Sequence, residues 1–148
     1  MSAFQMNQFG LKNQAGETMN VNPSTISVKV TKDLGAASYY YPGDVVDVVA
    51  AEAGDAIAVS KISLGSAGLG VILSNAKKSI FSANDMVEIG LRGTIVTMKA
   101  ATTANRGAVS YIPSTGYVAA TSGTRIGWML DICNEVGGLV RVLVDPLA

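Results

Sequence analysis

Apolar and polar residues alternate in short runs from residue 23 onward. In TISVKVT, residues 25–31, the side chains of Ile26, Val28 and Val30 fall on one face of an extended chain, and polar side chains fall on the other. This period of two is typical of a half-buried antiparallel strand. Runs of the same kind recur at residues 44–50, 56–62, 70–74, 86–91, 94–99, 108–112, 117–121, 126–132 and 139–144. The pattern therefore predicts about ten short strands and no amphipathic helix.

Turn sequences separate these runs. YPGD at residues 41–44 places proline where φ is preset and glycine where φ must be positive, as a type II turn requires. IPSTGY at residues 112–117 and NEVGGL at residues 134–139 have the composition of hairpin connections. GSAGLG at residues 65–70 leads into a strand and not a helix, so a hairpin loop explains it better than a phosphate-binding loop. Short strands joined by such turns predict an all-β sandwich or barrel.

Residues 1–22 have a different composition from the rest of the chain. Glutamine, asparagine and glycine dominate, and the large apolar residues Phe4, Met6, Phe9 and Leu11 are scattered among them. Such a segment buries too little apolar surface by itself to offset the loss of backbone entropy. We therefore predict an extended N-terminal arm at residues 1–22 and a single β domain at residues 23–148. The two phenylalanines either fold back on that domain or anchor the arm on a partner.

The overall composition indicates a surface that partners cover. The 148-residue chain is 49% hydrophobic and 15% charged, against about 25% charged in an average soluble domain. Its 11 basic residues balance 11 acidic residues, which supplies no cationic footprint for nucleic acid. No run approaches the ~18 apolar residues of a membrane span, and the N-terminus lacks the pattern of a signal peptide. We expect no nucleic acid or membrane partner, although a neutral monomer stays an alternative to a partner-covered surface.

Catalytic chemistry has little support in the sequence. Histidine is absent and Cys133 is the only cysteine, which excludes His-dependent nucleophiles and Cys/His zinc clusters. Cys133 lies in an apolar run and is expected in the core. Asp44 and Asp47 flank turns and strand surfaces, so we interpret them as solvated. Since no residue pattern indicates a catalytic, cofactor or metal site, we expect a protein that is not an enzyme and has no cofactor.

One acidic and basic pair is a possible exception. In DMVEIGLRG, residues 85–93, Glu88 and Arg92 share the outward face of a strand. Four residues of extended chain separate them by about 13 Å, which is too far for a direct ion pair. We interpret both as polar residues on a strand surface, with Gly93 marking a bend.

Exposed aromatic side chains are the best candidates for contacts with a partner. Within the cluster Tyr39, Tyr40 and Tyr41, alternation buries either Tyr40 or its two neighbours. Trp128 shares a face with Ile126 in RIGWMLDI, so we expect it in the core and not on a sugar-binding platform. Our candidates for contact with a partner are therefore Phe4, Met6, Phe9, Leu11, Tyr39 and Tyr41.

The order of these segments resembles the small decoration, or cement, proteins of tailed-phage capsids. The resemblance is carried by YYPGDVVDV at residues 40–48, GLGVILSNAKKSIFSANDMVEIGLRGTIVTM at residues 68–98, GAVSYIPSTGYVA at residues 107–119 and RIGWMLDICNEVGGLVRVLVDP at residues 125–146. Each motif alone is only glycine and alternation, and their order together is more specific. The similarity covers residues 40–146 and brings no catalytic motif with it.

The resemblance implies a β-barrel or β-tulip domain on the outside of the capsid, at junctions between major capsid protein subunits. It also implies a homo-oligomer, commonly a trimer, that is made in the cytoplasm of a host bacterium and becomes part of the virion. An extended arm would lie over the neighbouring capsid protein. Two alternatives stay open: another structural or adhesive β module of a tail, a fibre base or a carbohydrate-binding domain, and a small trimeric nucleotide-hydrolysing β enzyme.

Overall fold

A computed structural model describes residues 14–18, 24–31, 39–49, 57–62, 68–103, 105–120 and 123–145. These residues contain twelve strands. The described residues contain no helix. The strands are β1 (Thr25–Val30), β2 (Tyr39–Tyr40), β3 (Val45–Val48), β4 (Ala58–Lys61), β5 (Gly70–Ile72), β6 (Phe81–Ser82), β7 (Met86–Gly90), β8 (Ile95–Lys99), β9 (Gly107–Ile112), β10 (Tyr117–Ala119), β11 (Thr124–Met129) and β12 (Leu139–Val144).

Five of these strands close into a barrel in the order β1, β4, β3, β5 and β7. All neighbouring pairs are antiparallel except β1 with β4, which is parallel. Of the three residues that alternation assigned to the inner face of β1, Val28 and Val30 are fully buried inside the barrel, and Ile26 is partly buried against the same core. The two-stranded sheet of β2 and β6 adds Tyr40 and Phe81 to the same core.

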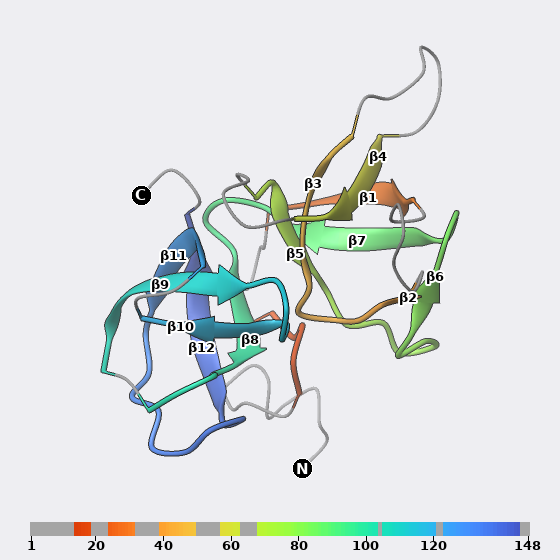
Figure 1. Ribbon diagram of the computed structural model, residues 1–148. Helices are drawn as coiled ribbons and strands as arrows, with labels where there is room; N and C mark the ends of the chain where they lie inside the picture. Colours follow the sequence, from red (N-terminus) through yellow and green to blue (C-terminus); the bar gives the residue numbers. More distant parts are fainter. Residues whose placement is uncertain are drawn as a thin grey trace.

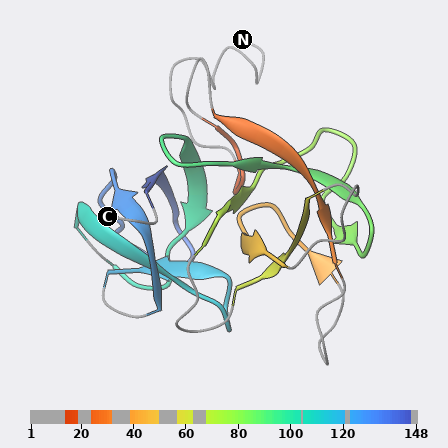
Figure 2. The same cartoon turned by 90° about the horizontal axis from the view of Figure 1, so that it is seen from above.

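The other five strands form a curved sheet in the order β10, β9, β11, β12 and β8. Its two edges approach each other where Ala100 bridges Val118 and the Ala101 amide donates to the Val118 carbonyl at 2.8 Å. The sheet is therefore a half-barrel, and Figures 1 and 2 show it beside the closed barrel.

Strands β3 and β5 form a wall that the two cores share. Val45 and Val71 face the core of the half-barrel, whereas the next residues, Val46 and Ile72, face the core of the closed barrel. All four side chains are buried. Because alternate residues of a strand point to opposite faces, this wall needs consecutive apolar residues, which the VV and GVI segments supply.

The structure confirms the predicted all-β fold class with a barrel. Each of the ten predicted runs contains one strand, and the two additional strands, β2 and β6, are only two residues long. The turns at YPGD and IPSTGY are confirmed, since Gly43 and Gly116 have φ values of +96° and +75°, and NEVGGL joins the paired strands β11 and β12. The hairpin predicted at residues 65–70 was wrong, because β4 and β5 each pair with β3 and not with each other. Cys133 is buried as expected.

From the sequence we interpreted Asp44 as solvated, and the structure shows that this was wrong. Its carboxylate is buried and accepts hydrogen bonds from the Tyr41 amide at 2.8 Å and from the Tyr111 hydroxyl at 3.3 Å. The Lys61 Nζ lies 3.8 Å from the same carboxylate. Asp44 thus closes the YPGD turn before β3 and ties it to β9 of the half-barrel. The turn sequence alone did not indicate this second, long-range partner.

Trp128 is also not where alternation placed it, because β11 contains a bulge. The pairing with β9 shifts between Arg125 and Gly127, so that Ile126 and Met129 are both buried and Trp128 points outward. Gly127 has a φ of +152°, and a Cβ there would overlap the carbonyl oxygen of Leu143. Only glycine is compatible with this bulge, which reverses the phase of every residue after it.

From the contact between Asp44 and Tyr111 we predict how the free energy of unfolding changes at alkaline pH. Burial, and then the neighbouring Asp44 carboxylate, raise the pKa of the Tyr111 phenol above its ordinary value. Because the pKa of Tyr111 is higher in the folded than in the unfolded chain, the neutral phenol contributes its full stability below the unfolded pKa of about 10. This contribution is lost as the pH rises above that value. At pH 8 we expect Tyr111→Phe to reduce the free energy of unfolding by about 1 kcal/mol. This difference from the wild type should shrink above about pH 10.

Chemical denaturation between pH 8 and alkaline pH measures this difference. Tyr117→Phe, on the neighbouring strand β10, is the matched control and should stay parallel to the wild type. Parallel curves for the wild type and Tyr111→Phe would contradict the prediction.

Candidate partner-binding surfaces

A groove of about 720 Å³ runs along the seam between the closed barrel and the half-barrel. One side is formed by the turn at Tyr41 and Pro42 and by the loop that follows β5. The other side is formed by Lys99 at the end of β8 and by the start of β12. Its lining residues are Gln14, Ala15, Tyr41, Pro42, Ser74, Asn75, Ala76, Lys77, Lys78, Ser79, Lys99, Gly137 and Leu139.

Residues 16–18, which we call the strap, tie the N-terminal segment to this seam. The Gly16 amide donates to the Thr97 carbonyl at 2.7 Å, and the Thr97 amide donates to the Glu17 carbonyl at 2.9 Å. On the barrel side, the Ser74 amide donates to the Gly16 carbonyl at 2.9 Å. The strap therefore covers the edge of β8 and connects it to the residue that follows β5. Because Gln14 and Ala15 line the groove, the strap places the preceding residues at its rim.

Gly16 allows the strap to fit into the seam. Its φ is +83°, and a Cβ there would lie 2.6 Å from the Pro42 Cβ and 2.8 Å from the Ser74 nitrogen. A side chain at this position would therefore strain the backbone and also overlap its neighbours.

The groove is basic. Within the described part of the chain, its charged lining residues are Lys77, Lys78 and Lys99. The Lys78 Nζ lies 3.0 Å from Asp85, outside the lining. The backbone N–H of Ser82, and then Lys78, hold the pKa of the Asp85 carboxyl below its ordinary value. Among the described residues, no ion pair involves Lys77 or Lys99.

The tyrosine cluster resolves into one buried residue between two exposed ones. Tyr40 is buried and its hydroxyl donates to the Thr31 carbonyl, whereas Tyr39 and Tyr41 are 53% and 46% exposed. The Lys61 Nζ lies 5.8 Å from the centre of the Tyr41 ring. The two candidate contact residues at this site are therefore available to a partner, and Tyr41 lies in the groove. The other four candidates, Phe4, Met6, Phe9 and Leu11, lie outside the described residues.

A smaller hollow of about 210 Å³ continues the groove past Tyr41. It shares Ala15, Pro42 and Lys99 with the groove and reaches Tyr117 on β10. The hollow extends the candidate surface from the barrel onto the half-barrel.

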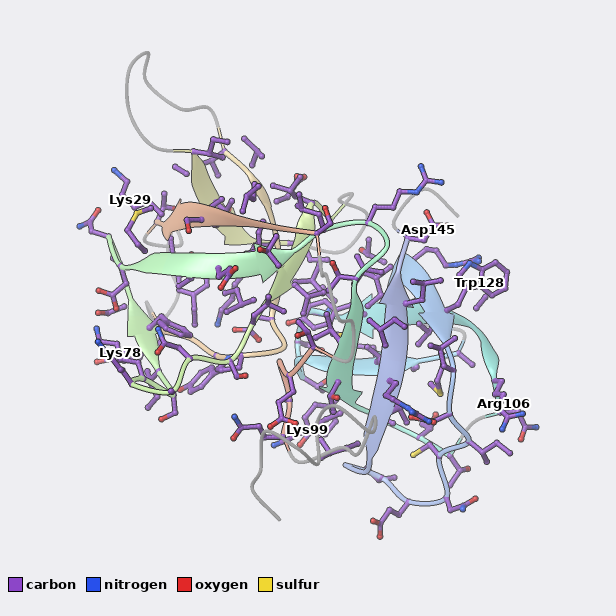
Figure 3. The ribbon with its side chains drawn as sticks, turned by 180° about the vertical axis from the view of Figure 1, so that it is seen from behind. Lys29, Lys78, Lys99, Arg106, Trp128 and Asp145 are labelled. Atoms are coloured by element: carbon purple, nitrogen blue, oxygen red, sulfur yellow. The ribbon has the colours of Figure 1, made fainter. Side chains whose placement is uncertain are left out.

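A second candidate surface lies on the outer side of the half-barrel, around β11. We call it the Trp128 surface, and its exposed apolar residues are Trp128, Leu130, Ile132 and Val136. The guanidinium carbon of Arg125 lies 4.9 Å from the centre of the Trp128 ring, and the Arg106 Nε donates to the Leu130 carbonyl at 3.0 Å. Figure 3 shows Trp128 and Arg106 on one side of the molecule and Lys78 on the other.

Sequence reasoning missed the Trp128 surface, although a signal was present. A glycine within an otherwise regular strand pattern indicates a bulge, and Gly127 immediately precedes Trp128. The lysine groove was also missed, because its three lysines come from two separate parts of the chain.

The spacing of Glu88 and Arg92 predicted that they form no direct ion pair, and the structure confirms this. Glu88 accepts a hydrogen bond from the Thr25 hydroxyl at 2.7 Å, and Arg92 lies 3.0 Å from Asp145. The described residues contain no group of three or more His, Cys, Asp or Glu side chains that would hold a metal ion. They also contain no helix of the length and hydropathy needed to cross a membrane.

Compared with protein-family models, with curated proteins and with solved structures, the chain has no significant match.

The strap makes a prediction about local stability. We expect Gly16→Ala to reduce the free energy of unfolding by about 1 to 3 kcal/mol, because it adds both backbone strain and overlap. Gly93→Ala is the matched control: Gly93 has a similar φ of +93°, but a Cβ there meets no atom within 4 Å. Gly93→Ala should therefore reduce the free energy of unfolding by less than Gly16→Ala, because it adds backbone strain without overlap.

Hydrogen exchange gives a residue-specific readout of the same change. In Gly16→Ala, the amides of Ser74 and Thr97 should exchange faster, because both donate to the strap. The amide of Ile72, which donates to the Asp44 carbonyl within the wall, should keep its protection. Unchanged exchange at Ser74 and Thr97 would contradict the role of the strap.

Proposed function

We propose that this chain is a structural virion protein that decorates a tailed-phage capsid. In this proposal it binds the outer surface of the assembled shell, at junctions between major capsid protein subunits, and stabilises the shell. It is made in the cytoplasm of the host bacterium and carries out no catalytic step. The order of the motifs at residues 40–146 supports the choice of family.

The observation that carries the proposal is the exposure of aromatic side chains at two separate places. Tyr41 lies in the seam groove, Tyr39 is exposed two residues before it along the chain, and Trp128 is exposed on β11 of the half-barrel. Exposed apolar patches on a folded protein usually mark interaction sites. Two such surfaces suit a protein that contacts both a shell and another copy of itself.

Shell stabilisation follows from mass action. A protein that binds the assembled shell but not free subunits stabilises the shell by about 2.7 kcal/mol per site at a concentration one hundred times its Kd. The effect is repeated at every equivalent site of the shell, so that each contact needs only modest affinity.

Binding to shells tests this function directly. We expect the purified protein to co-sediment with expanded shells from a panel of tailed phages, and not with unassembled capsid subunits. Electron microscopy of the mixture should place it on the outer surface at subunit junctions. Failure to bind any expanded shell, or equal binding to free subunits, would overturn the proposal.

The contribution of the arm is tested by removing residues 1–13 only. This truncation deletes Phe4, Met6, Phe9 and Leu11 but keeps the strap, whereas a longer truncation would also remove Gly16 and its hydrogen bonds. The truncated protein should unfold at the temperature of the full chain and bind shells much more weakly. Equal shell binding by both proteins would show that the arm makes no contact.

We propose that copies of the chain associate through the Trp128 surface, with a trimer as the state that the family resemblance implies. Tryptophan and arginine are the residue types enriched at the energetic centres of interfaces, and here the guanidinium of Arg125 lies over Trp128.

Analytical ultracentrifugation checks this association. Trp128→Ser should dissociate the oligomer, whereas Tyr39→Ser, which removes a comparably exposed aromatic at the other surface, should leave its mass unchanged. A monomeric wild type, or an oligomeric Trp128→Ser, would contradict the prediction.

The exposure of Trp128 also favours a second candidate, an adhesive module of a tail or fibre base that binds carbohydrate. A flat aromatic ring offers an apolar face on which a sugar ring packs. Since Arg125 lies over this ring, we favour the protein interface. Glycan binding that disappears in Trp128→Ser, with no binding to shells, would instead support the adhesive module.

A further inference from the structure

The groove at the seam concentrates positive charge on a chain whose net charge is zero. Among the residues that the structure describes, its charged lining residues are three lysines and none of its lining residues is acidic. One of the three, Lys78, contacts Asp85, whereas Lys77 and Lys99 have no ion pair within the described ranges. A hollow lined by charges of one sign attracts groups of the opposite sign. The groove is therefore complementary to an anionic occupant.

The occupant must also match an apolar lining. Tyr41, Pro42 and Leu139 lie among the lysines, and the Tyr41 ring is about half exposed. A single-stranded nucleic acid is bound by several aromatic rings along a continuous basic track. The described lining of this groove offers one aromatic ring and no arginine. Carboxylates interspersed with apolar side chains match it better, which favours an acidic polypeptide segment.

The chain's own N-terminal residues do not have this chemistry. Residues 1–13 contain one lysine and no acidic residue. Charge therefore favours an occupant supplied by another protein. Gln14 and Ala15, which follow these residues in the sequence, line the groove, and the strap holds them there with hydrogen bonds to both sides of the seam.

We infer that the groove binds an extended acidic segment of a partner protein, with Lys77 and Lys99 contacting its carboxylates and Tyr41 packing on its apolar side chains. The identity of this partner rests on the proposed function, in which it is the major capsid protein. The groove and the arm then bind the same partner side by side. Each contact raises the effective concentration of the other.

A peptide probe tests the groove without any shell. The probe is a fluorescein-labelled peptide of repeated Glu-Glu-Leu, and binding is followed by fluorescence anisotropy at low and at raised salt. We expect the wild type to bind and Lys99→Glu to weaken binding on the order of tenfold. Higher salt should weaken the wild-type interaction, because exposed charges are screened.

The matched control is Lys29→Glu, an identical charge reversal on a strand of the closed barrel that lies well away from Lys99 (Figure 3). It should change the affinity of the peptide by less than about twofold. Equal losses in Lys29→Glu and Lys99→Glu would overturn the inference, since only net charge would then matter. Tighter binding of an oligothymidylate than of the peptide, lost in Lys99→Glu, would overturn it in favour of nucleic acid.

Shell binding by the same variants separates the two proposals. If the wild type and Lys29→Glu co-sediment with expanded shells and Lys99→Glu does not, both the groove and the function are supported. If Lys99→Glu binds shells as well as the wild type, the groove is not the shell contact and the inference fails, while the proposed function stands. If the peptide binds in the groove and no shell retains the wild type, the proposed function fails, and the groove still takes an acidic partner of another kind.

Discussion

The wall of β3 and β5 is the constraint on which the rest of the structure depends. Val45 and Val71 pack into one core and Val46 and Ile72 into the other, so neither face of the wall is open to water. Full burial of such a side chain stabilises the fold by about 1.5 to 3 kcal/mol. A substitution here disturbs two cores through one short strand. The wall also fixes the seam, because the YPGD turn enters β3 and the groove loop leaves β5.

Much of this fold was predictable from periodicity. Alternating residues such as Val28 and Val30 gave the correct inner face, because a half-buried strand has one apolar side and one polar side. The consecutive apolar residues of the wall were counted among the half-buried runs, although such residues are typical of strands buried on both faces. They did not indicate what would cover each face, since that depends on which distant strands pair. The predicted barrel is confirmed, and periodicity alone did not indicate that a second core, inside a half-barrel, packs against it.

The errors at Trp128 and Asp44 have physical causes of different kinds. Trp128 was placed in the core by counting in steps of two, and the bulge before Gly127 made that count wrong by one residue. Asp44 was read as a turn residue, which is correct for its bond to the Tyr41 amide, but its second partner, Tyr111, is 67 residues away along the chain.

Likewise, Lys77 and Lys99 are unremarkable in sequence, and only the folding of β8 beside the loop after β5 brings them into one groove. Local patterns carry information on propensity and burial, whereas a site assembled across a seam depends on tertiary packing.

The strap links the architecture to the proposed function. A terminal segment that binds a partner contributes most when its attachment point is fixed close to a second contact, because effective concentration falls as the span between contacts grows. Gly16 fixes that point within the seam, between Pro42 and Ser74, and a larger residue would not fit there. Figure 3 shows Lys78 and Lys99 of the groove on a different side of the molecule from Trp128. In the proposed function, this separation leaves the Trp128 surface available to another copy while the groove and the arm contact the shell.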